Sequence, residues 1–253
     1  MWRWFQCIGL AALLALPTTA WSDTLRLVGD PWPPFVGANL KGGGLATDIV
    51  RAALERAHYQ VTFEEAPWAR ALKGIEEGRY DVLVDAWYSE ERAQIGRFSA
   101  PFLTNRLRFV ALQGSAIPVV KGLSALYPYS IAVVRGYAYT PEFDNDPQLR
   151  KVPVQSFQAA LTMLAGGRVQ LALEDEYVAN YLLALQPATV RDKLKLLDPP
   201  LVENGLRILV SLKRPDYGAI AEAFNQAMAA MRADGTLEAL FNAHGVTSLV
   251  PEP

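Results

Sequence analysis

The strongest constraint on the fold is an alternation of short apolar strands and amphipathic helices that runs twice along the chain. The first round opens with a strand at 25–29 and a helix at 45–57 whose apolar residues share one face. The second round occupies 131–197, and two amphipathic helices follow at 217–232 and 236–243. Alternation of this kind predicts an α/β protein with layers around mainly parallel strands.

The two rounds share a weak internal echo. With a shift of 89 residues, 71–85 aligns with 160–174, and both read helix, glycine, arginine, apolar strand and acid without a gap. So short a match is equally compatible with chance and with common ancestry. It predicts two lobes of similar build, each with a strand that ends in a carboxylate facing a ligand crevice.

Apolar segments at 107–112 and 206–212 are the natural crossings between such lobes, and two crossings form a hinge. We therefore expect lobe 1 to comprise 23–110 plus 206–253, and lobe 2 to comprise 111–205. The two C-terminal helices are expected to pack back on lobe 1.

Residues 1–22 are expected to be a signal peptide. Arg3 precedes an apolar run at 8–16, which is well short of the ~20 residues that a membrane helix needs. Small residues then allow cleavage after Ala20 or after Ser22. An uncleaved N-terminal anchor is the alternative. The only cysteine, Cys7, lies in this segment, so a cleaved chain has neither a disulfide nor a thiolate metal site.

Composition narrows the partners. Cleavage after Ser22 leaves 231 residues with 23 basic and 26 acidic side chains, a net charge of about −3. Without a basic tract, nucleic acid is an improbable partner. We expect a monomer without cofactor or metal, exported to a periplasm, because an exported protein that lacks a lipid anchor needs an outer barrier to retain it.

Three segments hold candidate binding residues. The proline-rich loop at 30–35 holds Trp32 and Phe35 rigidly, either as a wall for a ligand or as a cap on the core. Beyond the strand that carries Asp85, Ser89 is a good helix N-cap, and Arg92 one turn later suits a carboxylate, unless a surface acid pairs with it.

In the second round, Gly136 ends a strand before a helix, where free backbone N–H groups attract anions. The acids at 174–176 follow another strand and suit an ammonium group or a helix cap. The two histidines, His58 and His244, are far apart, and the glycines at 42–44 lack the residues of a phosphate loop, so enzyme motifs are scarce.

Taken together, these segments resemble the family 3 extracellular solute-binding proteins, the periplasmic polar-amino-acid receptors of ABC importers. The resemblance covers nearly the whole mature chain, in order, through the segments at 30–35, 45–49, 78–82, 89–92, 98–102 and 173–176. It implies a two-lobed Venus-flytrap fold with two hinge crossings and the ligand between the lobes.

The resemblance also implies roles for single residues. Arg92 matches the arginine that grips an α-carboxylate, and Asp175 the acid that receives the α-amino group, with Asp30 near the same pocket. Trp32 matches the stacking aromatic residue. The backbone donors of the second lobe correspond to Gly136, Tyr137 and Ala138.

Several residues depart from the family pattern. Trp87 stands after Asp85 where the family has a small or hydroxyl residue, and Tyr137 replaces a hydroxyl after the glycine. Trp68 and Arg70 add bulk and positive charge near the cleft. We therefore expect a ligand that is larger, more aromatic or more acidic than a standard amino acid, or one that resembles a small peptide.

The sequence thus predicts a non-enzymatic receptor that captures a small carboxylate-bearing ligand, an amino acid or a related compound, and delivers it to an ABC importer permease in the inner membrane. Two alternatives stay open. One is a periplasmic dehydratase of the cyclohexadienyl dehydratase type, with Glu174 or Glu176 as the general acid. The other is a ligand-sensing receptor without transport.

Overall fold

The structure is a computed structural model that describes residues 24–117, 122–246 and 249, so the expected signal peptide lies outside the described residues. The strands are β1 (Thr24–Gly29), β2 (Gln60–Glu65), β3 (Val82–Trp87), β4 (Gly96–Phe98), β5 (Leu103–Leu112), β6 (Ser130–Val134), β7 (Arg150–Val154), β8 (Leu171–Asp175), β9 (Leu194–Leu196) and β10 (Val202–Ser211). The α-helices are α1 (Leu45–Arg56), α2 (Trp68–Glu77), α3 (Glu90–Ala93), α4 (Pro141–Asn145), α5 (Phe157–Ala165), α6 (Glu176–Ala184), α7 (Ala188–Arg191), α8 (Tyr217–Ala233) and α9 (Thr236–Ala243).

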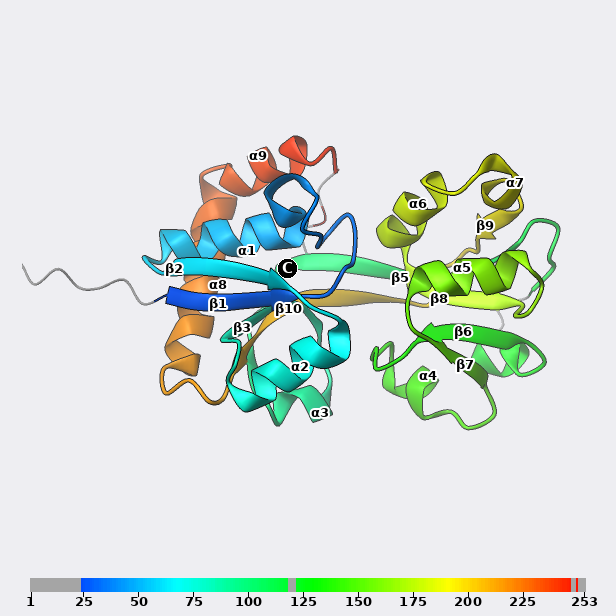
Figure 1. Ribbon diagram of the computed structural model, residues 1–253, viewed down its shortest axis with the longest axis horizontal. Coiled ribbons are helices and arrows are strands. Elements are labelled where there is room, and N and C mark those ends of the chain that lie inside the picture. Colours follow the sequence, from blue (N-terminus) through cyan, green and yellow to red (C-terminus); the bar gives the residue numbers. More distant parts are fainter. Residues whose placement is uncertain (1–23, 118–121, 247–248, 250–253) are drawn as a thin grey trace, which may run out of the picture.

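The strands form one continuous sheet in the order β2-β1-β3-β10-β5-β8-β6-β7, which runs through both lobes (Figure 1). Within each lobe the strands pair in parallel, as the alternation predicts: β1 with β2 and β3, and β6 with β7 and β8. The central strands differ, because β10 pairs antiparallel with both β3 and β5.

The long strands β5 and β10 connect the lobes. They pair with each other from Leu103↔Leu206 to Leu107↔Val202, and beyond that register each continues into one lobe. This arrangement is the two-crossing, two-lobed α/β fold that the sequence predicts. The predicted divisions at 110 and 206 fall inside these two strands, and the exact bounds of the lobes stay a prediction.

Each lobe has its own helical cover. Helices α8 and α9 pack on α1 in the first lobe, as expected for the C-terminal helices, and Phe224 of α8 meets Phe102 with ring centroids 5.6 Å apart. In the second lobe α5 packs on β6 and β8. Burial of these apolar faces stabilises each lobe by roughly 25 cal/mol per Å² of apolar surface removed from water.

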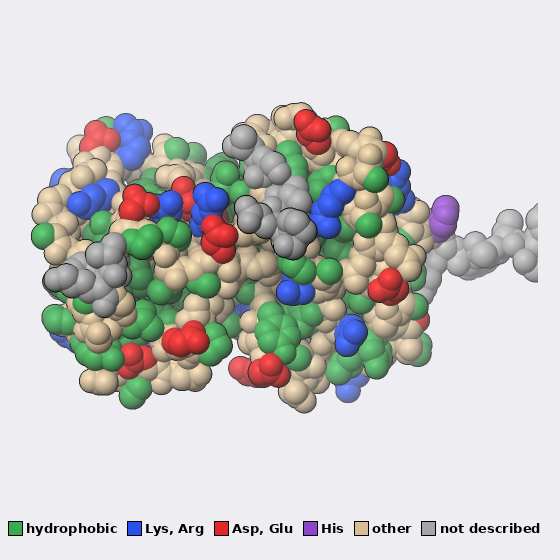
Figure 2. Space-filling model, turned by 180° about the vertical axis from the view of Figure 1, so that it is seen from behind, with side chains coloured by type: hydrophobic (Ala, Val, Ile, Leu, Met, Phe, Trp, Pro, Cys, Tyr) green, Lys and Arg blue, Asp and Glu red, His purple; other side chains and the backbone are tan. Residues whose placement is uncertain are grey.

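The outer surface is mixed in charge. Seen from behind, the two lobes meet at a waist, and acidic and basic side chains are scattered over this face (Figure 2). Within the described ranges, no helix has the length and apolar character that a membrane crossing requires.

The echo of the sequence corresponds to a repeated unit. Helix α2 leads into β3, helix α5 leads into β8, and each of these strands pairs antiparallel with a long connecting strand. Asp85 of β3 and Glu174 of β8 therefore hold equivalent places in the two lobes, and both side chains are buried. The repeat brings one acid from each lobe to the junction.

Candidate functional site

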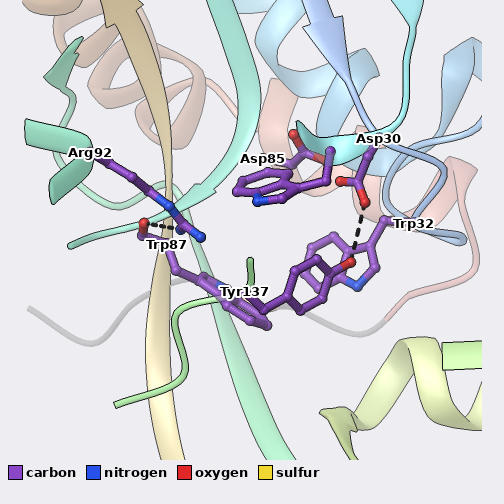
Figure 3. A pocket seen from close by; sticks show the side chains of 7 residues that line it. Asp30, Trp32, Asp85, Trp87, Arg92 and Tyr137 are labelled. Atoms are coloured by element: carbon purple, nitrogen blue, oxygen red, sulfur yellow. Dashed lines mark hydrogen bonds between the residues drawn. The ribbon is translucent and has the colours of Figure 1, made fainter. Parts of the chain in front are cut away.

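A pocket between the lobes gathers seven of the twelve predicted site residues. Six of the seven come from the first lobe, and Tyr137 extends from the second lobe (Figure 3). The space between the lining side chains, including the part open to solvent, is about 230 Å³. The lining residues are Asp30, Trp32, Trp68, Asp85, Trp87, Arg92 and Tyr137.

Arg92 joins the two lobes. Ser89 caps α3 by accepting a hydrogen bond from the Arg92 backbone N–H, as the sequence predicts, and this cap positions the arginine at the pocket. Its guanidinium donates to the backbone oxygen of Trp87 at 2.7 Å and to that of Gly136 at 3.1 Å. Burial lowers the pKa of Arg92 to about 10, so the side chain stays charged at neutral pH.

Trp68 strengthens the same contact between the lobes. It begins α2, lies 4.6 Å below the Arg92 guanidinium, and donates its indole N–H to the oxygen of Gly136 at 3.0 Å. Gly136 therefore presents its carbonyl to the first lobe, whereas the sequence analysis expected its backbone N–H to be the binding group. Its φ of 80° is in the left-handed region, which orients the carbonyl in this way.

Tyr137 fills the centre of the cleft. Its hydroxyl donates to Oδ2 of Asp30 at 3.2 Å, and its ring lies edge-on to Trp68 and Trp87 at centroid distances of 5.8 and 5.7 Å. Burial, and then the neighbouring Asp30 carboxyl, raise the pKa of Tyr137 well above its ordinary value. The hydroxyl therefore remains a neutral donor to Asp30.

Buried acids surround this hydroxyl. Burial raises the pKa of Asp30 to about 6 and, together with the charge of Asp30, that of Asp85 well above the ordinary range. The side chains of Asp30 and Asp85 also interact directly, because a hydrogen bond between the two carboxyl groups raises the pKa of Asp85 and lowers that of Asp30.

Glu174 approaches from the second lobe. Its Oε1 accepts from the Trp32 indole N–H at 3.2 Å and from the Asp175 backbone N–H at 2.9 Å, while its Oε2 has no partner among the described residues. Burial raises the pKa of Glu174 to about 8. The sequence analysis named Glu174 as one of three acids suited to an ammonium group or a helix cap and as a candidate general acid, and the internal echo with Asp85 also pointed to it.

Asp175 lies outside the pocket lining. Its Oδ1 accepts from the backbone N–H groups of Tyr177 and Val178 and so caps α6, and its Oδ2 accepts from the side-chain amide of Asn105 at 3.1 Å. Burial raises its pKa to about 7. Asn105, which the sequence analysis missed, also accepts from Trp87 at 2.9 Å and thereby links the hinge strand β5 to the pocket.

The other predicted residues lie around the pocket rather than in it. Phe35 is a core residue with its ring 4.8 Å from that of Trp32. Arg70 is exposed on α2, and Ala138 is half-buried. Within the described ranges, no cluster of three or more His, Cys, Asp or Glu residues has a geometry suited to a metal ion.

Two lobes, two connecting strands and a cleft lined from both sides by aromatic and charged side chains are an arrangement suited to binding a small molecule between the lobes. The chain belongs to the bacterial extracellular solute-binding proteins, family 3, whose sequence pattern matches residues 25–247. It is similar to ABC transporter arginine-binding protein 1 of Escherichia coli (strain K12), with 28% identity over 90% of this chain and 94% of the relative.

A second relative is the histidine-binding periplasmic protein of Escherichia coli (strain K12), with 27% identity over 91% of this chain and 88% of the relative. Among solved structures, a histidine kinase sensor domain with similarity to periplasmic binding proteins superposes with a TM-score of 0.77. It shares 23% identity and covers 91% of this chain and 99% of its own, a likeness of fold.

Proposed function

We propose that this protein is a monomeric periplasmic receptor that captures a small carboxylate-bearing solute between its lobes and delivers it to the permease of an ABC importer in the inner membrane. The solute is an amino acid or a related compound. Relatives named as arginine- and histidine-binding proteins support this class of ligand. The expected signal peptide supports the periplasmic location.

The observation that carries the proposal is the position of Arg92. Its side chain is buried where the lobes meet, and it lines the pocket. Two of the N–H groups of its guanidinium donate hydrogen bonds to the backbone oxygens of Trp87 and Gly136. The remaining N–H groups donate a hydrogen bond to no described residue. A ligand carboxylate that pairs with these donors joins both lobes through Arg92, so binding favours the closed form that a permease recognises.

The test is a thermal-shift screen of amino acids and related acids, followed by titration of the hits. A solute at about a hundredfold its Kd stabilises the folded form by about 2.7 kcal/mol, a shift of several degrees in Tm. Arg92→Ala abolishes this shift and Arg92→Lys retains part of it, because lysine keeps the charge without the planar fork. Arg97→Ala, an exposed residue of β4, is the matched control. A full shift in Arg92→Ala contradicts the assigned carboxylate contact.

A dehydratase activity is the second candidate, and the buried Glu174 favours it. A pKa of about 8 keeps this side chain protonated at neutral pH, as a general acid requires. Glu176, the other candidate acid, instead pairs with Arg108 at 3.0 Å. Incubation with prephenate or arogenate tests this candidate: aromatic product that disappears in Glu174→Gln supports the enzyme, and absence of turnover rejects it.

A further inference from the structure

The segment that follows β6 extends from the second lobe into the cleft and makes three hydrogen bonds to the first lobe. Gly136 accepts two of them at its backbone oxygen, from Trp68 at 3.0 Å and from Arg92 at 3.1 Å. Tyr137 donates the third, from its hydroxyl to Oδ2 of Asp30 at 3.2 Å (Figure 3). Two neighbouring residues of one lobe therefore hold the other lobe at the pocket.

The oxygen of Gly136 uses an N–H group of the arginine that is proposed to bind the ligand carboxylate. One terminal nitrogen of Arg92 donates to this oxygen, and the other donates to the oxygen of Trp87. A carbonyl oxygen has two lone pairs, so the donors from Arg92 and Trp68 saturate it. A solute therefore meets Arg92 with part of its donors already used, and it gains the full set only when Gly136 moves away.

The ring of Tyr137 fills the space beside two tryptophans. It lies edge-on to Trp68 and Trp87, at centroid distances of 5.8 and 5.7 Å, an arrangement that is favourable between aromatic rings. Tyr137 is itself a lining residue of the pocket, and the space between the lining side chains is about 230 Å³. The ring thus occupies volume that a solute of amino-acid size needs, and its removal enlarges the space.

The backbone at Gly136 is adapted to this contact. Its φ of 80° is in the left-handed region, where glycine alone is free of strain, and a Cβ added there would lie 3.3 Å from Cδ1 of Trp68. The absence of a side chain lets the Gly136 carbonyl approach the indole, and the indole in turn lies 4.6 Å from the Arg92 guanidinium. The three groups pack as a unit across the cleft.

We infer that Gly136 and Tyr137 act as an internal ligand, which keeps the lobes closed when no solute is bound, and that a solute must displace Tyr137 to enter. Tyr137 therefore lowers the affinity of the receptor, because apparent affinity falls with the fraction of molecules that is competent to bind. A cleft that is filled in about 90–99% of molecules weakens binding about ten- to a hundredfold. The closure goes beyond the proposed function, and the effect on affinity rests on it.

The first test measures the lobes without solute. The only cysteine, Cys7, lies in the expected signal peptide, so spin labels can be attached at Lys73→Cys on α2 and Glu142→Cys on α4, exposed residues of different lobes (Figure 1). Pulsed electron paramagnetic resonance then measures the distance between the labels. The otherwise unaltered protein gives one short distance, and Tyr137→Ala gives a longer one, by more than the width of the first distribution. A long distance in both proteins, or no change between them, overturns the inference.

The second test measures affinity by calorimetric titration with L-arginine, L-histidine and L-glutamate, a set that spans basic, aromatic and acidic solutes. Tyr137→Ala binds at least one of them about ten- to a hundredfold more tightly than the unaltered protein does. Tyr137→Phe keeps the ring and loses only the hydrogen bond to Asp30, so its gain is about two- to tenfold. Tyr217→Ala, a half-exposed residue at the start of α8, is the matched control and changes neither affinity nor distance.

The outcomes separate this inference from other roles of Tyr137. Weaker binding in Tyr137→Ala makes the ring a contact of the bound solute and overturns the internal ligand. A lower Tm with unchanged affinity and distance indicates a structural role alone, which also overturns it. If no variant binds any amino acid of the thermal-shift screen, the proposed receptor function fails. The distance measurement needs no solute, so a short distance that lengthens in Tyr137→Ala still upholds the closure.

Discussion

Glu174→Gln is expected to remove a large part of the pH dependence of stability. The glutamine keeps the shape of the side chain, and its oxygen still accepts from Trp32 and from the Asp175 backbone. The substitution mimics the protonated acid but has no proton to lose. Because the pKa of Glu174 is about 8 in the folded protein, against an ordinary value of 4.5, the folded state holds a proton that the unfolded state releases.

The sign follows from this difference in proton binding. Between pH 4.5 and about 8 the unfolded chain binds fewer protons at this residue, so the free energy of unfolding falls as the pH rises. The full shift corresponds to roughly 4–5 kcal/mol. Opening of the lobes brings water to Glu174 and relieves part of this cost, so we expect a loss of about 2–4 kcal/mol between pH 5 and pH 8.5.

Urea denaturation of both proteins across this pH range measures the effect. The stability of the unaltered protein relative to Glu174→Gln falls steadily from pH 5 to pH 8.5. Comparison of the two proteins cancels the titration of groups that do not interact with Glu174, and it retains the coupling of Glu174 to Asp175 and Asp30, whose charges raise its pKa. The exposed Glu238→Gln serves as control and gives a profile parallel to that of the unaltered protein. If the stability of Glu174→Gln varies with pH in parallel with that of the unaltered protein, the reasoning is refuted.

Two further substitutions test the scaffold around the site. Gly44→Ala costs about 2–4 kcal/mol in the free energy of unfolding, because φ is 96° and the new Cβ meets the backbone oxygen of Phe35 at 2.4 Å. Gly114→Ala is the control, because Gly114 is also at positive φ but its added Cβ would have nothing within 4 Å, and it costs only about 1–2 kcal/mol. If urea denaturation shows equal losses of unfolding free energy for the two variants, the steric account is wrong. Asp81→Asn lowers stability at pH 7 by about 1–3 kcal/mol because Asp81 accepts three hydrogen bonds from Arg26. Burial raises the pKa of Asp81, but the Arg26 contacts outweigh it and hold the pKa below 3.8. The difference between the two proteins therefore shrinks as the pH falls below 3.8, and denaturation at pH 7 and pH 3 checks this.

The sequence by itself determined the local elements. Helix α1 begins at Leu45 and α9 at Thr236, as the apolar periodicity predicts, and Ser89 caps α3. These features depend on contacts within one or two turns of chain, where residue type and spacing decide the outcome. The repeated order of α2–β3 and α5–β8 was likewise legible, because it is a pattern along the chain.

Only the tertiary structure decided the chemistry of the cleft. Glu174 meets Trp32 across 142 positions of sequence, and Tyr137 meets Asp30 across 107, contacts that exist only because β5 and β10 bring the lobes together. Asp175 became a helix cap while its neighbour Glu174 faced the cleft, since successive side chains of a strand point to opposite sides. The roles of these acids depend on how deeply each side chain is buried and on contacts with residues that are distant in sequence. Neither can be predicted from the few residues on either side of each acid.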